Sequence, residues 1–307
     1  MAKILVTGGA GFIGSHIVDD LLAKKHRVVI IDNLSSGYAR NVNSKAKLYR
    51  FSIDSNRING IFRKEKFDYV FHLAGQIDIQ KSIDNPVADA TTNIVGSINI
   101  IQQSADNKVK KMVFASTGGA IYGETKGTPA TELFPEVPVS PYGIGKLAVE
   151  KYLEYFKLQY GLDYTIMRYS NVYGPRQNAK GEAGVVAIFI DNAIKNLQSI
   201  IYGNGKQTRD FLYVGDAVRA TVMAIKKNGK VMNVSTTKET SILQLYNKIM
   251  KIGNIQIKQK FGKSPDGDQR RSCLSNSLIR RKWNFSVSSS LDRGIKETIQ
   301  WFKEESL

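Results

Sequence analysis

Residues 1–32 constrain the fold more than any other stretch, because a strand, a glycine turn, a helix and a second strand follow in order. The apolar run 3–7 is broken by the glycines of 8–11. Apolar residues from Phe12 to Leu22 then recur at helical spacing, and a second apolar run ends at Asp32. This order predicts a parallel βαβ unit at the start of the chain.

The glycines of this turn have the spacing of a dinucleotide-binding loop. Gly8 permits the sharp turn, Gly11 lets backbone N–H groups approach a pyrophosphate, and Gly14 lets the helix pack closely on the strand. Asp32 stands where a carboxylate accepts hydrogen bonds from the ribose hydroxyls of an adenosine. It would repel a 2′-phosphate, and 33–35 offers no cation to offset that repulsion, so we expect NAD rather than NADP.

Strands and helices continue to alternate along the 307 residues. We predict strands at 48–51, 69–73, 111–115 and 164–168, and helices at 93–104 and 142–160. The fold class is therefore α/β, with a doubly wound parallel (Rossmann) sheet and a smaller α/β C-terminal substrate lobe. We expect the NAD-binding domain at 1–171, with later sheet strands from about 203–235, and mainly the substrate lobe at 172–307.

The net charge of +17 raises the question of a nucleic-acid partner. The basic residues are spread along the chain, with only short groups such as 270–271 and 280–282, and no recognition-helix pattern accompanies them. We therefore interpret the charge as a lysine-rich solvated surface and expect no nucleic-acid partner. A positive field would still favour an anionic substrate that carries a diphosphate.

The scarce cysteine and histidine residues form no metal-ligand pattern. They are Cys273, His16, His26 and His72, and we interpret all of them as structural. No apolar run is long enough to span a bilayer, and the first strand starts so early that we expect no signal peptide before it. A single cysteine suits a reducing cytoplasm, which is the expected location.

The candidate catalytic residues lie in the middle of the chain. Tyr142 and Lys146 are four residues apart on one predicted helix, so their side chains lie on one face. An ammonium one turn away, together with a positive nicotinamide, would lower the pKa of the phenol so that Tyr142 could take a proton from a substrate hydroxyl. Ser116 and Thr117 follow a central strand, where ligands bind in open α/β sheets, and one of the two has only a turn-forming role.

Several motifs together resemble the extended short-chain dehydrogenases/reductases, and over almost the whole chain they are most similar to the UDP-glucose 4-epimerase branch. The motifs are Thr7-Gly8-Gly9-Ala10-Gly11-Phe12-Ile13-Gly14, Asp32-Asn33-Leu34-Ser35-Ser36-Gly37, His72-Leu73-Ala74-Gly75, Ser116-Thr117-Gly118-Gly119-Ala120-Ile121-Tyr122-Gly123, Tyr142-Gly143-Ile144-Gly145-Lys146, Arg168-Tyr169-Ser170-Asn171-Val172-Tyr173-Gly174-Pro175-Arg176-Gln177 and Arg209-Asp210-Phe211-Leu212-Tyr213-Val214-Gly215-Asp216.

The resemblance implies roles for individual residues. The hydride-transfer triad would be Thr117, Tyr142 and Lys146. The residues around NAD would be Gly8, Gly11, Phe12, Ile13, Gly14, Asp32, Asn33, Ser36, Gly37, Ile53, Leu73, Ala74, Gly75, Asn93, Tyr142 and Lys146. The residues around the nucleotide sugar would be Ser116, Thr117, Tyr142, Asn171, Val185, Tyr202, Arg209 and Ser272, with Tyr202 beside the uracil and Arg209 on the diphosphate.

Four positions depart from the family pattern. Ser52 replaces an Asp that contacts adenine, and Ser275 replaces a common Asp near the last strand of the lobe. Pro265 stands where an Arg normally grips the diphosphate, so Arg270 or Arg271 would have to substitute. The loop after Ser116 is one residue longer than in some relatives, so the sequence leaves Ser116 and Thr117 both open as the catalytic hydroxyl.

The resemblance implies an isomerase, an NAD-dependent epimerase that inverts C4 of UDP-glucose or UDP-galactose through a 4-keto sugar. The small Ser272 extends this to the N-acetylated pair. A UDP-glucuronate epimerase or decarboxylase is an alternative, whereas a dehydratase is disfavoured because glycines follow Thr117 instead of an acid pair. A non-catalytic NAD-binding regulatory or RNA-binding relative is the alternative of another class. The family favours a homodimer built from two helices of the first domain.

Overall fold

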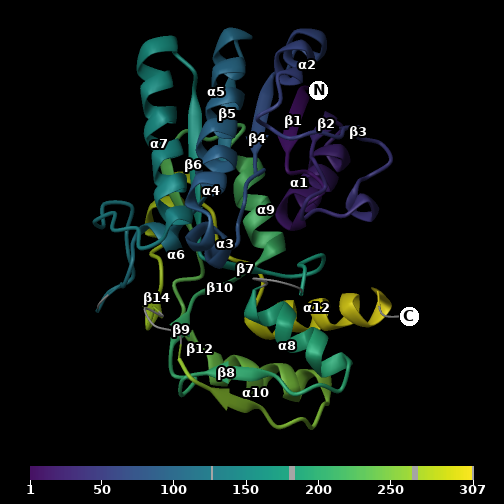
Figure 1. Ribbon diagram of the computed structural model, residues 1–307, viewed down its shortest axis with the longest axis vertical. Coiled ribbons are helices and arrows are strands. Elements are labelled where there is room, and N and C mark those ends of the chain that lie inside the picture. The colour runs from purple at the N-terminus through teal and green to yellow at the C-terminus, as the bar shows by residue number, and fades with distance from the viewer. Residues whose placement is uncertain (126, 180–183, 265–268, 306–307) are drawn as a thin grey trace. The chain divides into compact units, whose positions relative to one another are not determined.

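A computed structural model describes residues 1–125, 127–179, 184–264 and 269–305, and the chain forms two compact units (Figure 1). Unit 1 comprises 1–121, 137–168 and 218–232, and unit 2 comprises 122–136, 169–217 and 233–307. The expected division at residue 171 did not foresee that 122–136 belongs to unit 2, or that only 218–232 returns to unit 1.

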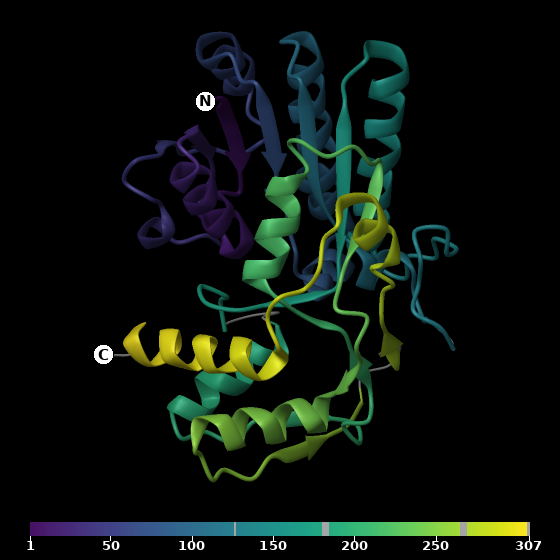
Figure 2. The same ribbon diagram turned by 180° about the vertical axis from the view of Figure 1, so that it is seen from behind.

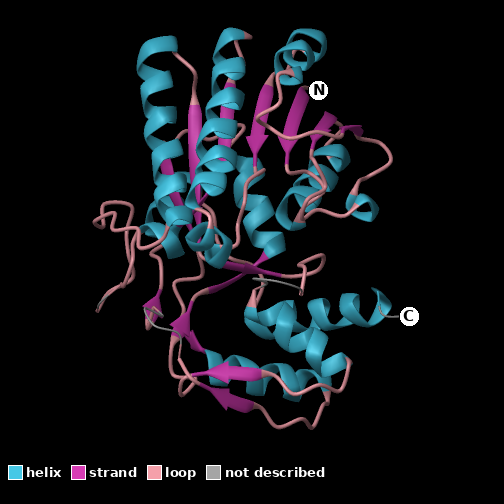
Figure 3. Ribbon diagram, in the orientation of Figure 1, coloured by secondary structure: helices cyan, strands magenta, loops and turns pink. Residues whose placement is uncertain are grey.

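Strands and helices alternate through unit 1 (Figure 3). In chain order they are β1 (Lys3–Thr7), α1 (Phe12–Ala23), β2 (Arg27–Ile31), η1 (Ala39–Asn41), β3 (Lys47–Tyr49), α2 (Arg57–Glu65), β4 (Tyr69–His72), α3 (Ile79–Asp84), α4 (Pro86–Ala90), η2 (Thr91–Val95), α5 (Gly96–Asp106), β5 (Lys111–Thr117), α6 (Gly118–Ile121) and α7 (Pro141–Tyr160). The elements β6 (Tyr164–Tyr169), α9 (Val214–Met223) and β11 (Val231–Val234) run across the unit boundaries.

The sheet of unit 1 is seven-stranded and parallel, in the order β11-β6-β5-β4-β1-β2-β3. β1 is central: Thr7 pairs with Ile31 of β2 on one side and with His72 of β4 on the other. The strand order reverses between β1 and β4, and ligands bind at such a switch point in open α/β sheets. The expected doubly wound fold is confirmed.

Helices cover both faces of this sheet, so its strands are apolar on both sides. α2, α5 and α7 lie on one face (Figure 1), and α1 with residues 218–223 of α9 lies on the other (Figure 2). On the first face Leu5, Phe62 and Leu153 are among the buried residues of one core cluster. Ile4 and Val6, which alternate with Leu5 along β1, are equally buried.

Three predicted elements differ from the structure at an end by two residues or more. The third strand ends at Tyr49, short of the predicted 48–51. The fifth strand continues through Thr117, because the Ser116 hydroxyl is anchored to a buried carboxylate of α7. The helix predicted at 93–104 is a π-helical turn, η2, followed by α5, and Gly96 at the start of α5 packs so closely on Ile53 that a Cβ there would lie 2.7 Å from Ile53 Cγ1.

Unit 2 has three small sheets and its own apolar core. Its elements are β7 (Asn171–Tyr173), α8 (Val185–Ile194), β8 (Ile200–Tyr202), β9 (Thr208–Arg209), β10 (Phe211–Tyr213), β12 (Thr240–Ser241), α10 (Ile242–Gly253), β13 (Lys260–Gly262), β14 (Arg271–Ser272), α11 (Ser277–Trp283) and α12 (Leu291–Glu305). The sheets are β10-β7, β12-β9-β14 and β13-β8. Phe189 of α8, Tyr246 of α10 and Phe302 of α12 are buried in the core of this unit.

Two residues interpreted as structural are buried and hydrogen-bonded. The His72 ring contacts the hydroxyls of Thr7 (2.7 Å) and Ser97 (2.9 Å), and burial lowers its pKa to about 3. The Cys273 thiol lies 3.9 Å from an Asp210 oxygen, and burial raises its pKa to about 12. Among the described helices, none combines the length and apolar character needed to cross a membrane.

Candidate active site

The glycine turn after β1 holds two backbone segments in very close approach. Gly8 has a φ of +71°, and a Cβ there would lie 2.6 Å from the backbone nitrogen of Ala74. A Cβ on Gly14 would lie 2.1 Å from the Gly8 carbonyl oxygen. Only glycine therefore fits at either position, and the turn delivers the N-terminus of the 12-residue helix α1 to the end of the sheet.

Asp32, directly after β2, is buried with its carboxylate against this turn. Its Oδ2 accepts a hydrogen bond from the backbone N–H of Ala10 (2.9 Å), and its Oδ1 accepts one from Leu34 (2.8 Å). Gly37, in the loop that follows, packs so closely that a Cβ would lie 2.8 Å from the carbonyl carbon of Ala10. The segment predicted to hold an adenosine ribose, which also includes Asn33 and Ser36, is thus fixed to the glycine turn.

The end of β4 is joined to β1 through a side chain. The Thr7 hydroxyl oxygen accepts hydrogen bonds from the backbone N–H groups of Leu73 and Ala74, each at 3.2 Å. A Cβ on the next residue, Gly75, would lie 2.8 Å from Asn93 Oδ1 and 3.6 Å from Lys146 Nζ. The structure therefore brings together segments that are separated by more than one hundred positions in the sequence.

Other residues predicted around NAD have different surroundings. Phe12 and Ile13 are half-buried in the first turn of α1. Ile53 is 3% exposed and packs in the apolar core, and its backbone carbonyl accepts a hydrogen bond from Asn99 Nδ2 at 2.8 Å. Asn93 is buried in η2, where its Oδ1 accepts from the Gln76 backbone N–H (2.8 Å) and its Nδ2 donates to Gln76 and Asp89.

Tyr142 and Lys146 share one face of α7. The helix begins with Ser140 as its N-cap, whose hydroxyl accepts from the Gly143 N–H at 3.2 Å. Lys146 Nζ lies 5.9 Å from the centre of the Tyr142 ring and donates a hydrogen bond to the Ala115 carbonyl at 3.1 Å. The end of strand β5 and the first turns of helix α7 thus meet at Lys146.

Burial shifts the ionisation of both members of this pair. Loss of solvation raises the pKa of the Tyr142 phenol, and the Asp89 carboxylate adds to the rise. Burial lowers the pKa of Lys146 to about 8, against the opposing effects of Asp89 and Glu150. The lowering of the phenol pKa expected from the ammonium together with a positive nicotinamide stays a prediction.

Ser116 and Thr117 are placed on opposite faces of β5 by the alternation of a strand. The buried Ser116 hydroxyl donates to the Glu150 carboxylate, which also receives Arg168 Nε at 3.0 and 3.1 Å. Thr117 is half-buried, and its hydroxyl accepts only from the Ala120 N–H, at 3.3 Å. The Ser116 hydroxyl, predicted as a substrate contact, is thus held inside unit 1 by a buried carboxylate, whereas the Thr117 hydroxyl is bonded to a backbone N–H of the next turn; their roles toward a substrate stay predictions.

In unit 2, three of the predicted substrate residues gather around one buried aspartate. Asn171 donates its backbone N–H to the Asp210 carbonyl at 2.9 Å, and Asp210 donates its own to the Ser272 carbonyl at 3.1 Å. Arg209 pairs with the 3% exposed Ser272 in the β9-β14 sheet. Val185 begins α8, and Tyr202 ends β8 with half of its surface exposed.

The two arginines proposed to replace an Arg at 265 differ in their surroundings, although Pro265 itself lies outside the described residues. Arg271 binds both carboxylate oxygens of Glu239, at 2.9 and 2.6 Å, and donates to the Thr125 carbonyl at 2.7 Å. Its guanidinium is therefore committed within the lobe. Arg270 is exposed, and the contacts described for it are made by its backbone, whose N–H donates to Glu124 and whose carbonyl accepts from the Thr208 N–H, so it is the arginine that remains as the candidate.

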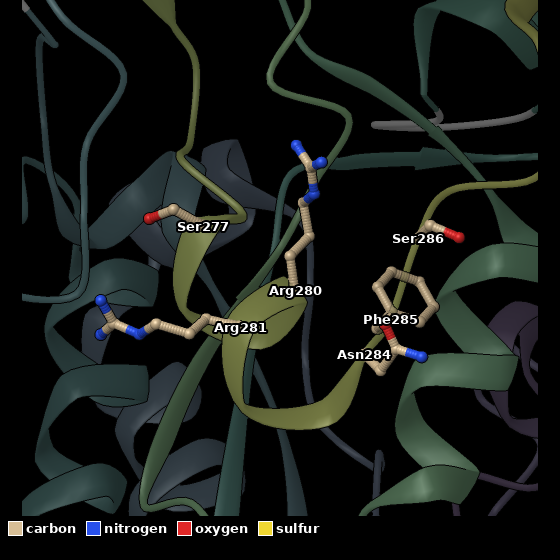
Figure 4. A pocket seen from close by; sticks show the side chains of 6 residues that line it. All are labelled: Ser277, Arg280, Arg281, Asn284, Phe285 and Ser286. Atoms are coloured by element: carbon tan, nitrogen blue, oxygen red, sulfur yellow. The ribbon is translucent and has the colours of Figure 1, made fainter.

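A cavity of about 410 Å³ in unit 2 is not part of this group (Figure 4). Ser277, Arg280, Arg281, Asn284, Phe285 and Ser286 line it. The two guanidinium groups point in different directions in Figure 4, so they do not converge on one anion. Within the described ranges no group of three or more His, Cys, Asp or Glu is placed to hold a metal ion.

Sequence reasoning missed three buried polar residues behind the pair on α7. They are Asp89, Glu150 and Arg168. A signal was present for two of them: Glu150 follows Lys146 by four residues, and Asp89 precedes Asn93 by four, so each shares a helix face with a predicted site residue. Their burial depends on tertiary packing.

Comparison with known proteins gives one consistent result. The model of the NAD dependent epimerase/dehydratase family matches residues 4–235. A putative UDP-glucose 4-epimerase of Methanocaldococcus jannaschii is 41% identical over 305 residues, which cover 99% of each chain.

Solved structures agree with this result. A UDP-glucose 4-epimerase of Thermotoga maritima with UDP-glucose is 42% identical, with a TM-score of 0.98 over 99% of this chain and 100% of that one. A UDP-N-acetylglucosamine 4-epimerase of Methanobrevibacter ruminantium, in complex with UDP-N-acetylmuramic acid, is 34% identical, with a TM-score of 0.94 over 99% of each chain.

Proposed function

This chain belongs to the NAD-dependent epimerase/dehydratase family, and from this premise we propose that it inverts C4 of a UDP-hexose, with UDP-glucose and UDP-galactose as the primary pair. It is an NAD-dependent UDP-sugar epimerase. The observation that supports the proposal is the pairing of Tyr142 with Lys146 on α7, with Lys146 bonded to the Ala115 carbonyl of β5, two residues before Thr117 at the carboxyl end of that strand.

The residues at the switch point fit a dinucleotide. The turn at Gly8 and Gly14 leaves no room for a Cβ, and the N-terminus of α1 favours a diphosphate. The Asp32 carboxylate, held against the Ala10 N–H, would accept hydrogen bonds from ribose hydroxyls. A dinucleotide held by these residues would supply reversible hydride transfer at C4 of the sugar.

Three side chains would serve the proton chemistry. Tyr142 would take the proton from the 4-hydroxyl and give it back after the sugar has turned. The Lys146 ammonium, with a pKa of about 8, is largely charged at neutral pH and would stabilise the phenolate against the burial that disfavours it. The Thr117 hydroxyl would position the same substrate oxygen by hydrogen bonding.

A purified-protein assay tests this function. UDP-galactose should be converted to UDP-glucose without net consumption of NAD. The turnover of UDP-glucuronate and the binding of RNA at moderate salt should be measured in parallel. Turnover of UDP-glucuronate alone would favour the uronate alternative, and tight RNA binding without any turnover would favour the non-catalytic one. A dehydratase is disfavoured because Gly118 and Gly119, which follow Thr117, offer no acid or base.

The exposed apolar side chains of α7 make a homodimer part of the proposal. Ile144, Tyr155 and Leu158 are 53%, 48% and 74% exposed, and Val95 of η2 is 56% exposed. Apolar surface of this kind is typical of a helix that packs against another copy. A monomer mass in sedimentation at micromolar concentration would contradict it.

The single cysteine, buried and free, agrees with a cytoplasmic location.

Cofactor choice gives a first prediction. Asp32→Ala should weaken NAD binding by about tenfold or more and reduce the preference over NADP, because it removes both the ribose acceptor and the repulsion of a 2′-phosphate. Asp32→Asn, which keeps an oxygen for the Ala10 N–H, should relax the preference with a smaller loss of NAD affinity. Titration of both dinucleotides by calorimetry checks this, and a wild-type preference for NADP would overturn the role given to Asp32.

Sugar size gives a second prediction. Ser272, four residues after the Gly267-Asp268 pair that lies outside the described residues, is small, and we propose that it leaves room for an acetamido group. Ser272→Tyr should lower the turnover of UDP-N-acetylgalactosamine relative to UDP-galactose by about tenfold or more, because a larger side chain excludes the group sterically. Ser272→Ala should keep the wild-type ratio. A wild type that converts UDP-galactose but no acetylated sugar would contradict this proposal.

A further inference from the structure

Asp89 is a buried carboxylate that the proposed mechanism does not use. It lies on α4, is 2% exposed, and its Oδ1 accepts hydrogen bonds from Gln76 Nε2 and Asn93 Nδ2, each at 2.9 Å. Both donors are neutral amides, and in the described part of the chain no lysine or arginine forms an ion pair with Asp89. An ionised carboxylate in such a place needs a compensating charge.

The nearest buried carboxylate, Glu150, has a different environment. Arg168 binds both of its oxygens, so this pair is neutral as a unit. Of these two carboxylates, Asp89 is the one whose charge is not balanced by a direct cationic partner. Burial raises its pKa, and the Lys146 ammonium is the one cation that lowers it.

The backbone places Asp89 beside Lys146. Asp89 Oδ2 lies 3.6 Å from where a Cβ on Gly145 would be, directly before Lys146. Asn93, which Asp89 holds, has its Oδ1 2.8 Å from the Cβ position of Gly75, and Lys146 Nζ lies 3.6 Å from the same point. The carboxylate, the amide and the ammonium therefore surround the segment after β4.

We propose that Asp89 is a positioning residue of the active site, which orients Asn93 and Gln76 beneath the segment after β4 and supplies the counter-charge of Lys146. The hydrogen bonds to the Asp89 oxygen fix which way both amides face, so the Asn93 oxygen meets the Gln76 N–H. The negative charge favours the ammonium form of Lys146 over the neutral amine. The catalytic consequence rests on the proposed function, and the charge coupling does not.

Other ionisable groups surround this cluster. They are Tyr142 and Glu150 on α7, His72 on β4, Arg168 on β6, and Lys81 and Asp84 on α3. Lys81 is bonded to Asp78 and is exposed, and His72 is neutral at ordinary pH because burial lowers its pKa to about 3. Asp84 lines the same 290 Å³ cavity as Asp89 but is exposed, which makes it a matched control.

The first test measures unfolding and needs no activity. Asp89→Asn can keep both hydrogen bonds, because Oδ1 accepts both, and loses only the charge. Lys146→Met should lower the urea midpoint more in the wild type than in the Asp89→Asn background, because only the wild type is left with an uncompensated anion. In the Asp84→Asn background the effect should equal that in the wild type. Equal effects in all three backgrounds would overturn the coupling.

Should Asp89→Asn alone not fold, the double variant with Lys146→Met decides the same question. It should fold, because both charges are removed together, and failure of the double variant to fold would overturn the proposal.

The second test is the pH profile of turnover, made with holoenzyme and UDP-galactose. The alkaline limb reports loss of the Lys146 proton, so Asp89→Asn should move it to lower pH by about 0.5 to 1 unit, whereas Asp84→Asn should leave it in place. A structural defect would lower turnover at every pH without moving the limb, and an unmoved limb overturns the electrostatic role. If the wild type converts no UDP-sugar, the proposed function fails while the unfolding test still reports on Asp89 and Lys146.

Discussion

Tyr142→Phe should lower turnover by at least ~10²-fold and leave NAD bound. The substitution removes one hydroxyl and keeps the ring that lies beside Lys146 Nζ. Without the hydroxyl no group of α7 at this position can accept the proton of a substrate alcohol. Because the dinucleotide contacts proposed at Gly8, Gly14 and Asp32 come from β1, α1 and β2, the variant should retain its cofactor.

The measurement is kcat with UDP-galactose, together with the absorbance and stoichiometry of dinucleotide released from the denatured protein. Tyr152→Phe is the matched control, because Tyr152 is exposed on the same helix and should keep kcat within about twofold of the wild type. Near-wild-type turnover of Tyr142→Phe would remove this residue from the mechanism.

Glu150→Gln should destabilise the protein by about 3–5 kcal/mol, the usual cost of leaving one member of a buried ion pair unpaired. Arg168 is 1% exposed, so its guanidinium has no access to water once the carboxylate is gone. The glutamine keeps a side-chain oxygen that can accept from the Ser116 hydroxyl, so the expected cost comes from the lost charge opposite Arg168. A change of this size is a large part of the stability of an ordinary domain.

Equilibrium unfolding in urea measures this effect. Glu154→Gln, an exposed carboxylate one turn later on α7, should change the free energy of unfolding by less than about 0.5 kcal/mol. If the two variants are equally stable, the Glu150–Arg168 pair is not the anchor that its burial indicates. Replacing both partners by apolar residues should recover much of the loss, because no charge is then buried alone.

Local geometry made several features predictable from the sequence. The strand, turn and helix at 1–32 follow from residue spacing alone, and glycines at Gly8 and Gly14 are required by close backbone contacts that any βαβ turn of this length makes. Tyr142 and Lys146 share a face because a four-residue step is nearly one helical turn. The family, the parallel sheet and the NAD dependence, all predicted from such motifs, are confirmed.

Other features depended on which distant segments meet, and no local pattern reports that. Ser116 and Thr117 are equivalent in the sequence, and only the packing of β5 against Glu150 of α7 separates a hydroxyl bonded to a buried carboxylate from one bonded to a nearby backbone N–H. Likewise Arg271 is occupied because Glu239 folds back onto it.

Charge states show the same dependence most clearly. The spacing of Tyr142 and Lys146, together with a positive nicotinamide, predicts a lowered phenol pKa. Among the groups of the chain itself, desolvation raises the pKa of Tyr142 and lowers that of Lys146. Desolvation depends on everything packed around a group, and the charge of Asp89, more than fifty positions before Tyr142 in the chain, adds to the rise for the phenol. The sequence therefore determined which groups are present and how they are spaced, and the tertiary structure decided which of them are buried, paired and charged.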